Sequence, residues 1–127
     1  KGRDAAEKIV RSAESPELQD LGASARDCLA EAEPELRAIH ETLSIAQSTD
    51  GDVPAAELRE ARDQLRRQLG WVSSDLETLR ALYPRLSRED QRLARDLRQP
   101  LETLRVELER AAHLLDALLV EHPPDPF

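Results

Sequence analysis

Hydrophobic residues recur at every third or fourth position along most of this chain, with polar residues between them. Positions spaced in this way lie on one side of an α-helix, so each series predicts an amphipathic helix. The pattern predicts three long helices, over residues 16–48, 54–83 and 88–121. The third helix has the most regular series, formed by Leu93, Leu97, Leu101, Leu104, Leu108, Ala111, Leu115 and Leu118.

The ends of these helices carry residues that are typical of helix starts and stops. Ser15 places a hydroxyl side chain at an N-cap, and Pro16 stands at the first helical position. Pro84 ends the second helix, because the residue before a proline disfavours the α conformation. Ser87 opens the third helix, and Asp90 three residues later predicts a capping box in which Asp replaces the usual Glu.

The connectors between the predicted helices are short, and residues 48–52 form a turn around Asp-Gly. Short connectors make consecutive helices antiparallel. We therefore expect an all-α fold in which residues 15–122 form an up-down-up, left-handed three-helix bundle. Residues 1–14 are predicted to be a short extra N-terminal helix or a linker, which would extend the bundle toward four helices. Residues 123–127 are predicted to be a disordered tail.

Two of the predicted helices contain an internal proline, Pro34 and Pro100. Proline removes one backbone hydrogen bond and clashes with the preceding helical turn. We therefore expect a kink or a short break near Ala32–Glu33 and a second kink near Pro100. The apolar series resumes in phase after Pro34, so the two halves of that helix should stay roughly collinear.

Composition narrows the classes of function. The 127 residues are 39% hydrophobic and 35% charged, which is too apolar for a disordered chain. A net charge of −8 opposes binding to nucleic acid or anionic lipid, and no apolar run is long enough to span a membrane. Cys28 is the single cysteine, which favours a reducing compartment, the cytoplasm. Because the chain lacks Met even at its first position, we expect it to be a fragment of a larger protein.

No arrangement of residues predicts an enzyme active site. His40 precedes Glu41 but lacks the further residues of a phosphotransfer helix, and His113 and His122 each stand alone. The sequence has no His-Glu-x-x-His motif and no Cys/His cluster, the usual zinc signals. Glutamates at residues 31, 33 and 35 are one candidate for cation binding, although such patterns usually form solvated faces. We therefore expect no catalytic residue, no cofactor and no metal.

Residues 16–121, with three long heptad-bearing helices and two tight turns, resemble a spectrin repeat. The resemblance implies a rod module of a larger cytoskeletal or scaffolding protein with tandem repeat neighbours. Spectrin repeats usually carry a tryptophan midway along the first helix, where this chain has Cys28–Ala32. Its only tryptophan, Trp71, lies on the second helix.

A second resemblance involves the run from Arg88 to Arg98, Arg-Glu-Asp-Gln-Arg-Leu-Ala-Arg-Asp-Leu-Arg. It is similar to the dimerisation helix of one class of bacterial sensor histidine kinases, in which such a run ends in the phosphoacceptor histidine. That position is Arg98 here, and arginine cannot accept the phosphate. This resemblance implies the alternative function, a regulatory or signalling domain that forms a homodimer without phosphotransfer.

The most distinctive surface feature is a row of arginines at helical spacing, here called the arginine row: Arg85, Arg88, Arg92, Arg95 and Arg98. One interpretation is a docking surface for an acidic protein partner. The other is intramolecular. The first and third helices run parallel in an up-down-up bundle, so salt bridges at the flanks of their seam would fix the helix register. The acidic partners would then be Glu17, Asp20, Asp27 and Glu31.

Trp71 follows Gly70 in the middle of the second helix. Glycine there costs roughly 1 kcal/mol relative to alanine, so we expect another helix to approach closely at Gly70. Trp71 falls just beside the apolar series, which predicts either a boundary residue on a helix seam or an interface anchor. The candidate partner-binding residues are therefore Trp71 and the arginine row. The expected function is a non-enzymatic helical interaction or scaffold module.

Overall fold

The computed structural model describes residues 2–47 and 53–121. The elements are α1 (Gly2–Ser12), α2 (Pro16–Gln47), α3 (Ala55–Leu82), a 3-10 turn η1 (Tyr83–Arg85) and α4 (Arg88–Glu121). Within those ranges every element is helical and no strand is present, which confirms the all-α prediction. The predicted turn at 48–52, the tail at 123–127 and His122 lie outside the described residues.

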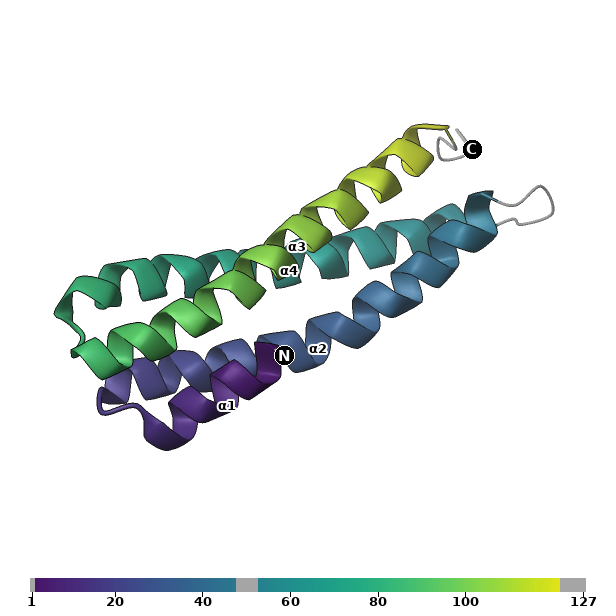
Figure 1. The fold of residues 1–127 in the computed structure, drawn as a ribbon. Coiled ribbons are helices and arrows are strands. Elements are labelled where there is room, and N and C mark those ends of the chain that lie inside the picture. The colour runs from purple at the N-terminus through teal and green to yellow at the C-terminus, as the bar shows by residue number, and fades with distance from the viewer. Residues whose placement is uncertain (1, 48–52, 122–127) are drawn as a thin grey trace.

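Two parts of the bundle differ in the number of helices (Figure 1). The helices α2, α3 and α4 follow one another in alternating directions along the length of the molecule. The short α1 packs against the first half of α2 and against α4, and it does not reach α3. We call the part that contains α1 the four-helix end, and the part where α2 ends and α3 begins the three-helix end.

The core is continuous through both ends and consists mainly of leucine and alanine. At the three-helix end the buried side chains include Leu36, Ile39, Leu43, Leu58, Leu65, Leu108 and Leu115. At the four-helix end the apolar core contains Ala6, Ile9, Leu18, Leu21, Leu29, Val72, Leu79, Leu97 and Leu101. These positions are largely the ones that the hydrophobic spacing predicts, because burying the apolar side stabilises a long helix more than local propensity does.

Both internal prolines lie inside continuous helices, so the alternative of a break near Ala32–Glu33 is wrong. The axis of α2 changes direction about midway along the helix in Figure 1, the region that contains Pro34. Proline removes only one hydrogen bond from the helix. The flanking Leu29 and Leu36 are both buried, and their packing holds the two halves of α2 in one element.

The predicted caps are present, but Asp90 makes different contacts from those of a capping box. Ser15 Oγ accepts a hydrogen bond from the Leu18 N–H (3.3 Å), and Ser87 Oγ accepts one from the Asp90 N–H (3.2 Å). The Asp90 carboxylate does not complete the box. It accepts hydrogen bonds from the backbone N–H groups of Glu14 (3.1 Å) and Ser15 (2.9 Å) in the α1–α2 connector. Asp90 is buried, and it ties the start of α4 to the end of α1.

Gly22 on α2 lies against another helix, and the expected close approach at Gly70 is wrong. A Cβ atom at Gly70 would have no neighbour within 4 Å, whereas one at Gly22 would lie 2.6 Å from Cγ2 of Ile9. The small side chain at position 22 therefore lets α1 approach α2 closely. None of the described helices is both long enough and apolar enough to cross a membrane.

Candidate partner-binding surface

The arginine row lies at the four-helix end, with Arg85 in η1 and the other four residues on α4. All five side chains are exposed. Arg85 lies 3.8 Å from Glu17, and Arg98 pairs with Glu102 one turn ahead at 2.9 Å. Arg88, Arg92 and Arg95 form no ion pair with any described residue.

Among the described residues, the predicted salt bridge between the arginine row and the acidic residues of the first long helix therefore forms only at Arg85, which lies near Glu17. Within the described residues, Asp27 instead pairs with Arg26 on its own helix, and Glu31 accepts a hydrogen bond from Gln64 of α3. The other arginines of the row do not pair with the acidic residues of α2 because α1 packs against both α2 and α4 at this end. The sequence predicts a short helix or linker over residues 1–14, but it does not predict which seam that segment occupies.

An open groove of about 870 Å³ runs between α3 and α4 at the four-helix end. Its apolar lining comes from Leu76, Leu79, Tyr83 and Ala94. Four arginines line it as well: Arg80 from α3, and Arg95, Arg98 and Arg105 from α4. The groove thus combines an apolar lining with a predominantly basic set of charges, since its acidic lining residues are Glu77 and Glu102. We call it the α3–α4 groove.

Two residues of this groove, Arg80 and Arg105, were not among the sequence-based candidates. Arg105 lies seven residues after Arg98, so the helical spacing of the arginine row, continued by two turns, would have included it. Arg80 comes from a different helix, and only the pairing of α3 with α4 brings it to the same groove. Arg105 Nε is buried and has no hydrogen-bond partner among the described residues, since Glu109 lies 4.0 Å away.

Trp71 lies on a different seam from the groove. Its indole N–H donates a hydrogen bond to Ser24 Oγ of α2 (2.9 Å), and its ring is half-buried against the core. Ser73 lines the α3–α4 groove. Trp71 points to nearly the opposite side of α3, because two residues of a helix at 100° each are 200° apart around its axis. The structure therefore places Trp71 at the α2–α3 seam, the position expected for a boundary residue, and does not bring it together with the arginines.

The same seam contains a cluster of buried polar groups. Ser24 Oγ, which accepts from Trp71, lies 2.9 Å from Asp75 Oδ1 and donates its proton to that carboxylate. Burial raises the pKa of Asp75 above its ordinary value of 3.8, and the hydrogen bond from Ser24 partly offsets the increase. Burial also raises the pKa of the nearby Cys28 thiol to about 12, with contributions from the charges of Asp75 and Glu31. Cys28 is thus a buried thiol that stays protonated at neutral pH.

Gln68 is the least satisfied member of this seam. Its side chain is 2% exposed, and neither amide atom has a hydrogen-bond partner among the described residues. The contacts Ser24–Trp71 and Glu31–Gln64 define the antiparallel register of α2 and α3, which places Gln68 opposite the turn that contains Cys28. Buried polar atoms without partners reduce stability, so Gln68 weakens the seam at this level.

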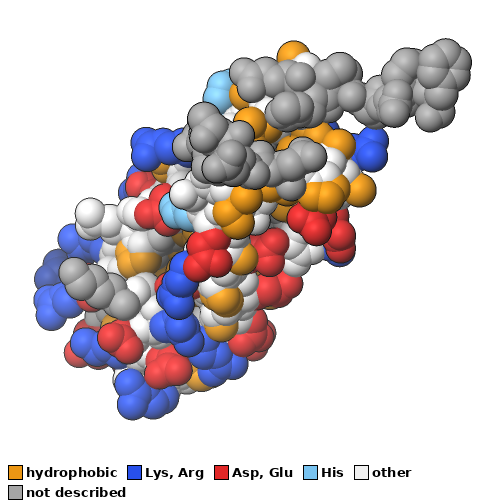
Figure 2. Space-filling view, turned by 90° about the vertical axis from the view of Figure 1, so that its right-hand side faces the viewer, with side chains coloured by type: hydrophobic (Ala, Val, Ile, Leu, Met, Phe, Trp, Pro, Cys, Tyr) orange, Lys and Arg blue, Asp and Glu red, His pale blue; other side chains and the backbone are white. Residues whose placement is uncertain are grey.

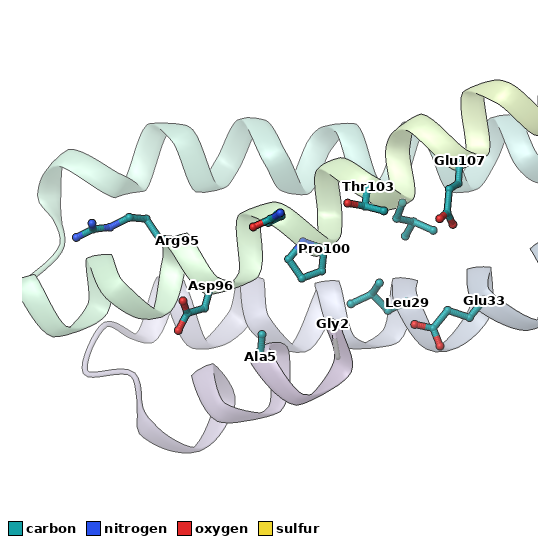
Figure 3. Close-up of a pocket in the computed structure, with 11 residues that line it drawn as sticks. Gly2, Ala5, Leu29, Glu33, Arg95, Asp96, Pro100, Thr103 and Glu107 are labelled. Atoms are coloured by element: carbon teal, nitrogen blue, oxygen red, sulfur yellow. The ribbon is translucent and has the colours of Figure 1, made fainter.

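On the other side of α4, α1 occupies the seam between α2 and α4 (Figure 3). Gly2 lies beside Leu29 and Pro100, and its small size allows this approach, since a Cβ there would lie 2.9 Å from Cβ of Pro100. Beyond Gly2, Glu33 and Glu107 line the same hollow, and Arg3 pairs with Glu33 at 3.3 Å. Arg95 lines both this hollow and the α3–α4 groove, so it lies on the ridge between the two seams.

No group of three or more potential metal ligands is present in the described ranges. His40 and His113 are exposed, and they lie on different helices. Of the three glutamates that flank Pro34, Glu33 pairs with Arg3 and Glu31 bonds to Gln64, so these side chains take part in separate contacts.

Comparison with models of known protein families, with curated proteins and with solved structures gives no significant match to this chain.

Proposed function

We propose that this chain is a non-enzymatic helical interaction module of a larger cytoplasmic scaffolding protein, and that it binds a protein partner through its arginine-rich face. This face comprises the arginine row together with Arg80 and Arg105, which line the α3–α4 groove beside Arg95 and Arg98. In this proposal α2, α3 and α4 form a left-handed, spectrin-repeat-like unit with α1 as an addition. The long consecutive helices, of 28 to 34 residues, support such a unit.

The observation that carries the proposal is that Arg88, Arg92 and Arg95 are exposed without an acidic partner in the described chain. Closely spaced like charges repel one another, so a basic row on an acidic protein costs free energy in the isolated molecule. Binding an acidic partner would remove that repulsion. It would also create specific charge pairing, which increases the association rate and discriminates among partners.

The test is charge reversal at the centre of the row. The double variant Arg92→Glu/Arg95→Glu is compared with Arg37→Glu/Arg59→Glu, which makes the same change in net charge at exposed positions of α2 and α3. We expect both variants to unfold at nearly the same temperature as the wild type. Crosslinking followed by mass spectrometry in cells that express the full-length protein should lose its partner crosslinks only in the first variant. Reduced stability of that variant with unchanged crosslinks would disprove the docking role.

A second candidate function is a homodimeric regulatory domain, and exposed apolar side chains at the three-helix end favour it. Ile45 is 53% exposed and Val120 is 78% exposed, and hydrophobic side chains gather at this end in Figure 2. Sedimentation over a wide concentration range distinguishes the candidates. A monomer at every concentration supports the module, and a dimer that Ile45→Glu dissociates supports the regulatory domain.

A further inference from the structure

The two seams that α4 makes at the four-helix end are lined by different residues. The α2–α4 seam holds α1, a helix that presents small residues and Ile9 to it. The α3–α4 seam is not covered by a described helix and opens as the α3–α4 groove. The molecule thus contains one example of a helix packed into a seam of α4, together with a second seam at the same level that is open.

From the contrast between the filled α2–α4 seam and the open α3–α4 seam, we propose that the α3–α4 groove is the docking site for an acidic amphipathic helix of another protein. The inference rests on the proposed function and names the part of the arginine-rich face that binds and the kind of segment that it binds. The groove has the two components that such a helix requires. Leu76 and Tyr83 offer apolar surface to the hydrophobic side of the ligand, and the arginines offer donors to carboxylates that flank it.

The length of the basic lining favours a helix over a small anion. Arg95, Arg98 and Arg105 span ten residues of α4, which is about 15 Å at 1.5 Å per residue. A phosphate or a single carboxylate would contact only part of that length. A partner helix with acidic residues three, four or seven positions apart would present a carboxylate to each arginine in turn.

The present ion pairs in the groove are weak enough for a partner to replace them. The Arg98–Glu102 pair is exposed, with 67% and 44% of the two side chains accessible to solvent, and exposed ion pairs of this kind contribute little to stability. Arg80 and Arg95 have no ion pair with a described residue, and the Arg105–Glu109 pair is long, at 4.0 Å. An incoming carboxylate would therefore reach the exposed guanidinium groups of Arg80 and Arg95 without displacing an existing ion pair.

The experiment uses a synthetic helical peptide of roughly 16 residues, with leucines along one side and glutamates flanking them at three- and four-residue spacing. A control peptide has the same composition in scrambled order. Binding to the full chain is measured by calorimetry, and its location by backbone amide shifts in NMR. We expect binding of the patterned peptide, with shifts concentrated in residues 73–83 and 94–105.

The matched variants are Arg98→Glu/Arg105→Glu in the groove and Arg66→Glu/Arg110→Glu, which are exposed and outside it. Because each reversal replaces an attraction by a repulsion, the groove variant should bind the peptide at least about tenfold more weakly. The control variant should change the affinity by less than about twofold. Thermal unfolding of both variants checks that each remains folded.

Three outcomes would overturn the inference. One is equal binding of the scrambled peptide. Another is displacement of the peptide by inorganic phosphate at equal ionic strength, which would indicate a simple anion site. The third is salt-sensitive dimerisation that the peptide inhibits, which would make a second copy of the chain the occupant. If crosslinks are lost in Arg92→Glu/Arg95→Glu but not in Arg98→Glu/Arg105→Glu, the proposed function stands and the groove is not the site.

Discussion

The two ends of this bundle pack their helices with different kinds of buried side chain. At the three-helix end, α2, α3 and α4 meet through leucine, isoleucine and alanine side chains, and no polar residue among the described residues there is buried as a whole, although the Nε atom of Arg62 is. At the four-helix end, the buried set includes Asp75 and Asp90, while Gln68 lies on α3 between the two ends. Leucine contacts are not directional, whereas buried hydrogen bonds fix which groups must meet. The added helix α1 is thus located where the polar contacts specify its position.

Deleting a large core side chain at the three-helix end should have the largest effect. Leu108→Ala removes a fully buried side chain from α4, and we expect a loss of about 2–5 kcal/mol in the free energy of unfolding, because a cavity replaces apolar contacts. Urea denaturation measures this loss in the free energy of unfolding. Val106→Ala on the same helix is the control, since Val106 is 44% exposed and should lose much less. Equal losses for the two variants would contradict the assigned core.

Removing the Asp90 carboxylate tests whether its hydrogen bonds hold α1 in place at the four-helix end. Asp90→Ala leaves the N–H groups of Glu14 and Ser15 without their carboxylate acceptor, and hydrogen bonds to a charged group contribute about 1.5–3 kcal/mol each. We expect a loss of roughly 2–3 kcal/mol after partial replacement by water. Hydrogen exchange should show α1 losing protection before α4. The exposed Asp96→Ala is the control, and uniform loss of protection would show that Asp90 does not act on α1 specifically.

Replacing the buried polar side chain of Gln68 by an apolar one would make its part of the core resemble the leucine core of the three-helix end. Gln68→Leu replaces two unpartnered amide atoms with apolar surface of similar volume, so we expect a gain of about 1–2 kcal/mol in the free energy of unfolding. Thermal and urea unfolding of this variant should both shift upward. Gln64→Leu, one turn earlier on α3, serves as a comparison because it loses the hydrogen bond to Glu31. Destabilisation by Gln68→Leu would mean that the amide has partners in solution.

Asp75 gives the four-helix end a pH dependence of its own. Its pKa is raised in the folded state, so the folded protein holds the proton more tightly than the unfolded chain does. The stabilisation from this group is present below the unfolded pKa and is lost as the pH rises through the folded pKa. The difference in unfolding free energy between the wild type and Asp75→Asn should therefore fall with rising pH across that interval and become constant above it. A constant difference at all pH values would contradict a raised pKa.

The smallest predicted effect is that of Gly70→Ala, and Gly22→Ala is its comparison. Gly70→Ala adds a methyl group to open space in a helix, and we expect stabilisation by roughly 0.5–1 kcal/mol from helix propensity alone. Gly22→Ala introduces a Cβ 2.6 Å from Ile9 Cγ2 and should destabilise the contact between α1 and α2. Thermal unfolding of both variants provides the measurement. Stabilisation by Gly22→Ala would show that α1 is not packed against α2 in solution.

The long helices, their approximate bounds and most of the leucine core can be predicted from the order of the residues alone. These features depend on spacing within one segment, which the 3.6-residue period makes visible. The caps at Ser15 and Ser87 were predictable for the same reason, since each acts within one helical turn. The arginine row was visible too, because its members share one side of a helix.

Which segments face one another depends on how the helices pack, and the residue pattern does not predict it. Asp90 has the sequence position of a capping-box residue, yet its carboxylate binds the connector before α2, far away in the chain. Trp71 and the arginines belong to different seams, and Arg80 and Arg105 reach one groove from two helices. A neighbouring helix approaches closely at Gly22 and not at Gly70. A helical period fixes the direction of a side chain around its own axis, but the neighbour in that direction depends on how all the helices pack.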